Sequence, residues 1–376
     1  MRVLCDRDDI LQAIRLAQNA ITSTTLPVLS HILLLAEEDR VNVTATNLET
    51  TICSSFEAKI EEEGSICLPG AKLYSILREL PPGQVFIETQ DSKGIIKMHQ
   101  IFFSLLGFAG EEFPQVPSPI ETVISVPQLT LQEAIEKTMW AAGQDEVRQN
   151  LNCVLFEGVL EGEEGKESPF LRAVATDGRR LSLLLIPDFP VSSPFKVLVP
   201  LKSVRQLAKI LEKEGDVKIG IEENRVLFQT TKFSFFSQLI DAKFPDYQGV
   251  IPKECELSFV VNRENLMAAI RRVSLLSEEQ TRLVKFNLKE GVLNINTTSA
   301  RMGSASERLS VSRIEGRREE IEIGFNAVFL MEALRVIQEE AVQVDLIDHE
   351  SPCVLYPQGS KNYIYVLMPV KLREET

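Results

Sequence analysis

Histidine is scarce in this sequence, and its cysteines are scattered. The three histidines, His31, His99 and His349, lie far apart along the chain. None of the six cysteines forms a C-x-x-C pair or stands beside a histidine at metal-binding spacing. Such patterns mark zinc sites, and isolated cysteines in a chain of this size are typical of buried apolar positions. We therefore expect no metal and no cofactor.

Long apolar runs are also missing. No stretch reaches the roughly 18 apolar residues that a membrane-spanning helix needs. The first ten residues, MRVLCDRDDI, hold three acidic residues and lack the apolar segment of a secretory signal. These absences favour a cytoplasmic protein without a membrane partner.

The familiar catalytic motifs are absent as well. There is no G-x-S-x-G, no Walker A loop and no G-x-G-x-x-G. Asp177, in ATDGRR, is the best single candidate for chemistry, but Asp-Gly is also a common turn signal. We expect no catalytic residue and a binding scaffold. The alternative is a hydrolytic enzyme, a phosphohydrolase, that uses Asp177 with Arg179 or Arg180.

Positive charge is in deficit, with a formal net charge of −14. Nonspecific affinity for nucleic acid comes from neutralising phosphates, so this balance by itself argues against such a partner. Net charge is a sum, however, and an acidic protein can still present a basic surface. The charge balance therefore leaves DNA binding open.

What the sequence does have is internal repetition. Three segments, RDDILQAIRLAQNAI, TLQEAIEKTMWAA and NRENLMAAIRRVSLL, place apolar residues three and four apart, which predicts helices. Alternating runs that predict strands follow each of them. Within these runs VTATNLETT, AVATDGRRL and NINTTSARM share a local form, which aligns Thr46, Thr176 and Thr297.

A second helix is predicted in each repeat, directly after a strand. Its start is marked by Pro69, Pro200 or Asn326, residues that favour helix starts. The pattern indicates an α+β fold of three similar units, with boundaries at 1–123, 124–253 and 254–376. Such units can tile edge to edge, because an open sheet edge invites pairing with another chain.

Four segments give the repeats a family resemblance. In chain order they are TLPVLSHILL, ATDGRRL, LIDAKFPDYQGVIP and YVLMPVKL. Together they resemble the bacterial DNA polymerase III beta subunit, the sliding clamp, over essentially the whole chain. The resemblance implies three tandem DNA-clamp domains with helices inside and antiparallel sheets outside. It also implies a ring-shaped, head-to-tail homodimer.

The function that the resemblance implies is topological. Such a ring encircles double-stranded DNA without reading its sequence and tethers the replicative DNA polymerase, which gives processivity. It is a subunit of the DNA polymerase III holoenzyme and not an enzyme by itself. Its other implied partners are an ATP-driven clamp loader, and further polymerases and repair proteins that bind through short linear motifs. The implied location is the cytoplasm, in association with the nucleoid.

The resemblance also implies a pocket for partner peptides. Its predicted residues come from the second and third repeats: Leu151, Thr176, Gly178, Arg179, Arg180, Leu181, Pro245, Val250, Val366, Leu367, Met368, Pro369, Val370 and Lys371. Methionine is adaptable and suits a surface that accepts several partners. Strand alternation predicts that Tyr365 and Leu367 point inward, while Val366, Met368, Pro369 and Val370 form the exposed surface.

Two further sets of residues are carried over from the family. The predicted DNA contacts are Lys72, Arg148 and Lys202. The predicted dimer interface has one side in the first repeat and the other in the third: Phe103, Leu105, Leu275 and Leu276. Apolar side chains at opposite ends of one chain fit a heterologous, ring-closing interface.

The sequence departs from the family in three places. Ser23 and Thr24 stand where an arginine often reaches DNA, so no DNA contact is expected from that loop. Gly249 stands near the place of a basic residue at the pocket rim. The tail Arg373–Thr376 runs beyond the point where many members end, next to the predicted pocket.

Overall fold

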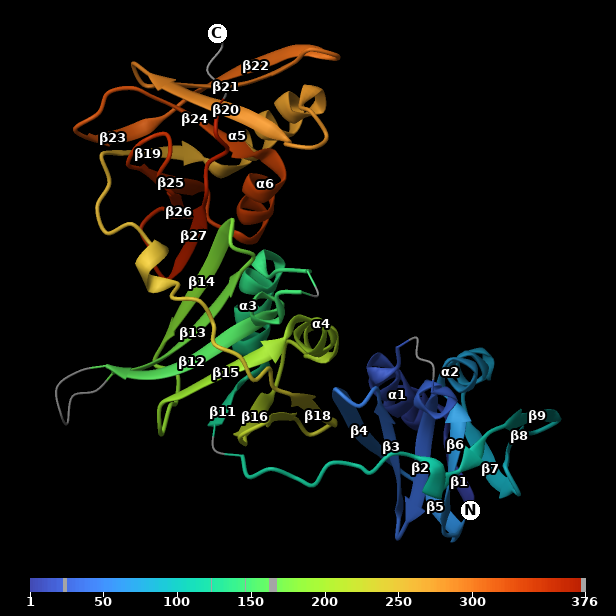
Figure 1. Ribbon diagram of the computed structural model, residues 1–376. Coiled ribbons are helices and arrows are strands. Elements are labelled where there is room, and N and C mark those ends of the chain that lie inside the picture. Colours follow the sequence, from blue (N-terminus) through green and yellow to red (C-terminus); the bar gives the residue numbers. More distant parts are fainter. Residues whose placement is uncertain (23–25, 123, 146, 162–167, 373–376) are drawn as a thin grey trace. The chain divides into compact units, whose positions relative to one another are not determined.

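The computed structural model describes residues 1–22, 26–122, 124–145, 147–161 and 168–372 (Figure 1). It divides into two compact units, Met1–Gln132 with Lys202–Asp241, and Glu133–Leu201 with Ala242–Thr376. Within the described ranges, no helix is both long and apolar enough to cross a membrane.

The first unit contains two antiparallel sheets in its described residues. The order of the five-stranded sheet is β5 (Lys59–Glu62), β1 (Arg2–Asp6), β7 (Gln84–Gln90), β8 (Lys93–Met98) and β9 (Ile101–Leu106). The order of the nine-stranded sheet is β10 (Phe108–Ala109), β6 (Gly64–Pro69), β2 (His31–Glu37), β3 (Arg40–Thr46), β4 (Thr50–Glu57), β18 (Phe233–Gln238), β17 (Arg225–Gln229), β16 (Asp216–Ile221) and β11 (Ile124–Pro127).

The second unit repeats this plan in its described residues. Its nine-stranded sheet has the order β15 (Phe195–Pro200), β12 (Cys153–Glu161), β13 (Ser168–Thr176), β14 (Arg180–Pro187), β27 (Tyr363–Leu367), β26 (Cys353–Pro357), β25 (Ala341–Leu346), β19 (Leu257–Asn262) and β23 (Ser312–Gly316). Its four-stranded sheet has the order β22 (Gly303–Ser310), β21 (Val292–Ser299), β20 (Leu283–Lys289) and β24 (Ile321–Asn326).

The helices fall where the repeat pattern predicts them. They are α1 (Arg7–Ala17), α2 (Gly70–Glu79), α3 (Gln128–Thr138), α4 (Leu201–Ile210), α5 (Arg263–Val273) and α6 (Ala327–Val336). Pro69 and Asn326 are N-cap residues, and the Asn326 side chain accepts a hydrogen bond from the Val328 N–H at 2.9 Å. The Asn326 side chain thus satisfies a backbone donor that the first helical turn leaves free, which fixes where α6 begins. Pro69 makes no side-chain hydrogen bond to α2 and marks its start through the restricted φ of proline.

Each nine-stranded sheet joins strands from neighbouring repeats. In the first unit β4 of the first repeat pairs with β18 of the second, from Thr50↔Ser237 to Ser54↔Phe233. In the second unit β14 of the second repeat pairs with β27 of the third, from Arg180↔Leu367 to Leu184↔Tyr363. The same two strands of the repeat meet at both junctions. The repeats are therefore joined by continuous main-chain hydrogen bonding.

Buried thiols should make the fold sensitive to alkaline pH. Cys153 is fully buried at the start of β12, and burial raises the pKa of its thiol to about 12. An unfolded thiol has a pKa of about 8.5, so above that pH the unfolded state loses a proton that the folded state keeps. Stability is therefore lost as pH rises from about 8.5 towards 12, by at most about 1.4 kcal/mol per pH unit for each thiol.

Urea unfolding of the wild type and of Cys153→Ala at pH 8 and pH 10.5 checks this expectation. The variant should start less stable, because it leaves a small cavity, and should lose less stability as the pH rises. Equal losses of unfolding free energy between pH 8 and pH 10.5 in the two proteins would contradict a raised pKa of the Cys153 thiol as the cause.

Candidate functional site

The turn between β13 and β14 is held by the side chains of Thr176 and Asp177. Asp177 Oδ1 accepts hydrogen bonds from the N–H groups of Arg179 and Arg180 at 2.9 and 3.1 Å. Thr176 Oγ1 accepts from the Gly178 N–H at 3.1 Å and donates to the Arg180 carbonyl at 2.6 Å. Gly178 has a φ of +86°, a conformation that glycine adopts without a Cβ clash. These bonds hold the turn in one shape.

The first repeat builds the same turn with an uncharged residue. Asn47 Oδ1 accepts from the N–H groups of Glu49 and Thr50 at 3.0 and 2.8 Å. An amide oxygen thus does at this position what the Asp177 carboxylate does in the second repeat. The role of Asp177 is conformational, and nothing in this geometry favours the hydrolase alternative. Among the described residues, no group of His, Cys, Asp and Glu side chains could hold a metal ion.

The corresponding turn of the third repeat corrects one alignment. Thr297 lies inside β21 and donates to the Leu283 carbonyl at 2.8 Å. At the end of β21 it is Ser299 Oγ that accepts from a turn N–H, that of Arg301, at 3.3 Å. The predicted equivalence of Thr297 with Thr46 and Thr176 is therefore wrong. Ser299 takes that place because β21 continues further before its turn.

Arg180 is the most heavily bonded side chain at this junction. Its side chain is buried, with the residue 8% exposed. Its guanidinium lies 5.1 Å from the ring centre of Trp140 and 4.2 Å from that of Phe329. It also donates to the Trp140 carbonyl at 2.8 Å and to Asp177 Oδ2 at 3.0 Å, and forms an ion pair with Glu332 of α6. Arg180 thus ties the second repeat to the third.

Electrostatics keep this arginine charged despite its burial. Burial lowers the pKa of Arg180, but the hydrogen bond to Glu332 and the nearby acidic groups outweigh it, so the pKa is raised. Sequence reasoning placed Arg180 at the pocket and missed Trp140, Phe329 and Glu332. The available signal was Trp140, the only tryptophan of the chain, at the end of the third predicted helix.

The segment after β27 supplies an exposed apolar surface beside the turn. The Met368 N–H donates to the Arg179 carbonyl at 2.9 Å, and the Val370 N–H donates to the Gly324 carbonyl at 2.8 Å. Met368 is 42% exposed, Pro369 and Val370 are half-buried, and Lys371 is exposed. We call Met368–Lys371 the C-terminal strip. Its backbone is fixed at both ends while its side chains stay accessible.

The structure corrects the predicted exposure of Val366. Tyr365 and Leu367 are buried as predicted, but Val366 is also only 3% exposed. Tyr365 and Val366 point to opposite faces of β27, so both faces of the strand are covered here and the buried–exposed alternation does not hold. Leu181, the cross-strand partner of Val366, is likewise buried. Leu181 and Val366 therefore lie beneath the predicted pocket and contribute little accessible surface to it.

Leu151 and Arg148 come together beside the turn. Leu151 is buried, and its N–H donates to the Arg148 carbonyl at 2.9 Å. Arg148 is exposed, and its Nη1 lies 3.6 Å from the place where a Cβ on Gly178 would stand. Arg148, predicted to contact DNA, therefore lies at the edge of the predicted peptide pocket.

The connection between the second and third repeats is anchored by Tyr247. Its ring is buried, and its hydroxyl donates to Glu157 Oε2 of β12 at 2.6 Å. Burial, followed by this hydrogen bond, raises the Tyr247 pKa to about 12. The anchor leaves Pro245 exposed and Val250 46% exposed, so both predicted residues are accessible.

Lys72, Lys202, Phe103 and Leu105 belong to the first unit. Lys72 is exposed in the first turn of α2, and Lys202 is exposed in the first turn of α4, 3.6 Å from Glu49. Phe103 and Leu105 are half-buried in the edge strand β9, where Phe102 and Leu106 are 59% and 71% exposed.

On the third repeat, Leu275 is 75% exposed and Leu276 is half-buried in the 3-10 turn that follows α5. Apolar side chains are thus accessible at both predicted sides of the dimer interface. The expectations for Ser23, Thr24 and Arg373–Thr376 fall outside the described residues.

Three repeated α+β units whose sheets join across the repeats form a clamp-type scaffold. Models of the DNA polymerase III beta subunit match the chain in order: the N-terminal domain at residues 1–117, the central domain at 125–246 and the C-terminal domain at 248–371. The chain belongs to the DNA polymerase III beta subunit family, the beta sliding clamps. It is accordingly a processivity subunit and not an enzyme.

Individual relatives agree over the full length. The beta sliding clamp of Pseudomonas aeruginosa is 32% identical over 99% of this chain and 100% of its own. The crystal structure of the DNA polymerase III beta subunit from Pseudomonas aeruginosa matches with a TM-score of 0.92, covering 99% of this chain and 100% of that one. The sliding clamp from Bacillus subtilis, 29% identical, covers the same shares and also gives a TM-score of 0.92.

Two neighbouring arginines provide a matched test of the junction. Arg180→Ala should lower the free energy of unfolding by about 2 to 3 kcal/mol, because it leaves Glu332 and Asp177 without their buried partner. Arg179→Ala removes an exposed side chain and should change stability by less than about 0.5 kcal/mol. Urea unfolding measures both. Similar effects in the two variants would show that Arg180 does not tie the repeats together.

Proposed function

We propose that two copies of this chain close head to tail into a ring that encircles duplex DNA and tethers the replicative polymerase. The observation that carries the proposal is the strand pairing between repeats. In each of the first two repeats, the strand that follows the turn at Asn47 or Asp177 pairs with the last strand of the following repeat. These pairs are β4 with β18 and β14 with β27. Applied once more, this rule pairs β22 of one copy with β9 of the other.

Both of these strands are free to pair. β9 is the last strand of the five-stranded sheet and β22 the first of the four-stranded sheet, so each has one open edge within the described chain. Open edges are a template for pairing. Joining unlike ends of identical chains is a heterologous contact, which forms a closed ring when the rotation allows it.

Side chains near the two edges fit such a contact. Phe103 and Leu105, with the more exposed Phe102 and Leu106, supply apolar area from β9. Leu275 and Leu276 supply it from the third repeat. Burying accessible apolar area contributes about 25 cal/mol per Å². The interface is thus expected to combine main-chain pairing with apolar contact.

The ring would hold DNA without reading bases. Lys72 and Lys202 occupy equivalent first turns of α2 and α4, where lysines can meet phosphates. Contacts of this kind are weak and independent of sequence, so they permit sliding. The net charge of −14 then keeps the remaining surface from binding DNA indiscriminately. We propose Arg148 as a pocket residue as much as a DNA contact, because it lies beside Gly178.

Partner proteins, among them the clamp loader, would bind at the junction of the second and third repeats. The turn Thr176–Leu181, Leu151, the anchored Pro245 and Val250, and the C-terminal strip supply the apolar and polar groups that an inserted peptide needs. Sliding clamps of Pseudomonas aeruginosa and Bartonella birtlesii have been solved bound to griselimycin. We propose that the same compound binds this chain and occupies the same pocket.

Domain boundaries and location complete the proposal. We place the domains at 1–123, 124–253 and 254–376; the three family models cover 1–117, 125–246 and 248–371, so the C-terminal model begins six residues before the proposed third domain. The two compact units divide the second of these because its strands complete sheets with both neighbours. We propose that the protein acts in the cytoplasm, in association with the nucleoid, where its DNA partner is found.

Retention on circular DNA tests the ring directly. Clamp loaded onto nicked circular plasmid by its loader and ATP should stay bound through a salt wash that removes nonspecific binders, because the link is topological. Cutting the plasmid once should release it, as gel filtration before and after cutting would show. Retention that does not change on cutting would contradict a sliding ring.

Separate variants should uncouple the pocket from the ring. Met368→Ala with Pro369→Ala removes apolar contact area from the C-terminal strip and should raise the Kd for griselimycin by about tenfold or more. Calorimetry measures this binding, and sedimentation should still show the dimer. Leu106→Glu in β9 is the matched control, and should weaken the dimer while leaving griselimycin binding unchanged. If the double alanine variant also loses the dimer, the strip serves the fold and not the pocket.

A further inference from the structure

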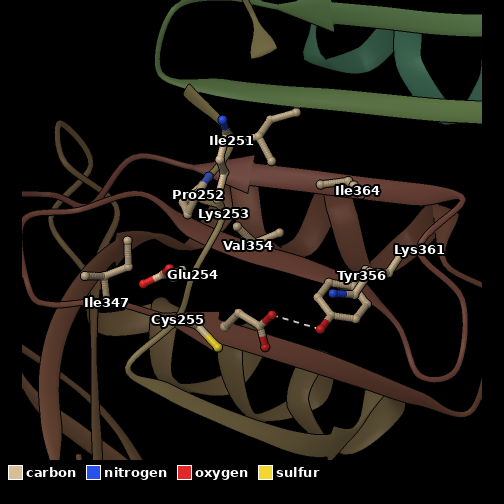
Figure 2. A pocket seen from close by; sticks show the side chains of 11 residues that line it. Ile251, Pro252, Lys253, Glu254, Cys255, Ile347, Val354, Tyr356, Lys361 and Ile364 are labelled. Carbon is tan, nitrogen blue, oxygen red and sulfur yellow. Dashed lines mark hydrogen bonds between the residues drawn. The ribbon is translucent and has the colours of Figure 1, made fainter. Parts of the chain in front are cut away.

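A small pocket lies on one face of the third repeat's strands. Figure 2 shows it between the connecting segment that carries Ile251 and the strands that carry Val354 and Ile364. Its volume is about 130 Å³. Small-molecule sites usually measure about 300 to 1,000 Å³, so this pocket suits one side chain better than a separate ligand.

The small pocket and the proposed peptide pocket are formed by neighbouring residues. Val354 pairs across strands with Val366, so these two side chains share one face of the sheet. Ile364 lies two positions before Val366 on the same strand, and therefore on that face as well. On the connecting segment, Ile251 directly follows the exposed Val250. A peptide that crosses Val250 can therefore extend towards Ile251 and Ile364.

Two acidic residues line the pocket, Asp345 and the exposed Glu254. Asp345 Oδ2 accepts from the Tyr356 hydroxyl at 2.8 Å. Its Oδ1 accepts from Ser258 Oγ at 2.7 Å and from Gln343 Nε2 at 3.2 Å, so three of its roughly four acceptor sites are filled by its own neighbours. Figure 2 shows Glu254 on the side of Ile347 and Cys255, away from Lys361 beside Tyr356.

Its lysine, in contrast, has no acidic partner. Lys361 Nζ lies 5.2 Å from the centre of the Tyr356 ring, and it forms no ion pair in the described part of the chain. Lys253, at the pocket rim, is exposed and likewise forms none there. The lining as a whole balances two lysines against two carboxylates, but Lys361 is the lysine beside the Tyr356 ring, away from Glu254. An aliphatic lining beside this ammonium group is complementary to an aliphatic side chain with a neighbouring carboxylate.

We propose that this pocket is a flanking subsite, which takes one aliphatic side chain of a partner peptide while an adjacent acidic residue faces Lys361. The inference rests on the proposed function, because it extends the same binding surface. It implies that partner peptides differ in affinity partly through residues that flank the segment bound in the main pocket. Lys361 is then a specificity-determining residue for acidic extensions.

Binding of matched peptides tests the subsite. The probes are fluorescein-labelled Ala-Leu-Ala-Leu-Phe and the same peptide extended by Glu-Leu at its N-terminus or its C-terminus. One extended peptide should bind the full-length protein about tenfold more tightly than the core peptide by fluorescence anisotropy. Lys361→Glu should abolish that gain and leave the affinity for the core peptide unchanged. Lys213→Glu makes the same charge change at an exposed position of the other unit and should keep the gain.

Cys255 offers a second readout inside the pocket. It lines the pocket and is exposed, whereas Cys5, Cys67, Cys153 and Cys353 are buried. Alkylation by N-ethylmaleimide, followed at Cys255 by mass spectrometry, should be slowed by the extended peptide and not by the core peptide. This footprint reports occupancy of the subsite independently of affinity.

The outcomes separate the two proposals. If the core peptide binds and griselimycin displaces it, but neither extension adds affinity or protects Cys255, the subsite is wrong and the main pocket stands. If neither the core peptide nor griselimycin binds, the proposed partner pocket fails, and the subsite fails with it. A gain that persists in Lys361→Glu would overturn the role of the lysine.

Discussion

The antiparallel pairing of β14 with β27 is the interaction on which the rest of the site depends. It brings the turn of the second repeat, at Asp177–Arg179, into register with the end of the third repeat's last strand. The Met368 N–H then continues this pairing to the Arg179 carbonyl, which fixes the start of the C-terminal strip. Without this pairing the turn and the strip would belong to separate repeats. The same main-chain pairing between β4 and β18 joins the first repeat to the second.

Side-chain contacts of Arg180 add specificity to the main-chain pairing between the second and third repeats. Arg180 stacks on Trp140 of its own repeat and Phe329 of the next, and pairs with Glu332. A buried ion pair adds little net stability by itself, but an arginine held on several sides selects one arrangement of the elements around it. The proposed peptide pocket is therefore a product of the repeat junction. Assembly of the chain and recognition of partners depend on the same contacts.

Local sequence signals predicted much of the fold, but not the environment of each residue. Helix starts at Pro69 and Asn326 were predictable because the fixed φ of proline and side-chain capping by asparagine are local properties. Val366 was predicted to be exposed because alternation assumes one solvated face, whereas both faces of β27 are covered at Tyr365 and Val366. The Arg180 contacts were missed for a similar reason: Phe329 and Glu332 lie far along the chain and resemble ordinary helix residues. The Thr297 alignment failed because the length of a strand before its turn depends on pairing partners.

The central claim is that a second copy completes the strand pairing that the chain leaves open at β9 and β22. Hydrogen exchange at these strands tests it most directly, because paired amides exchange slowly and open edges exchange quickly. At concentrations where the protein is a dimer, the amides in Ile101–Leu106 and Gly303–Ser310 that point away from β8 and β21 should be protected, and both sets should lose protection together on dilution. The variant Leu106→Glu should leave these outward amides unprotected at every concentration. Fast exchange of the outward amides of either strand in the dimer, or protection of them that does not change on dilution, would contradict ring closure through these edges.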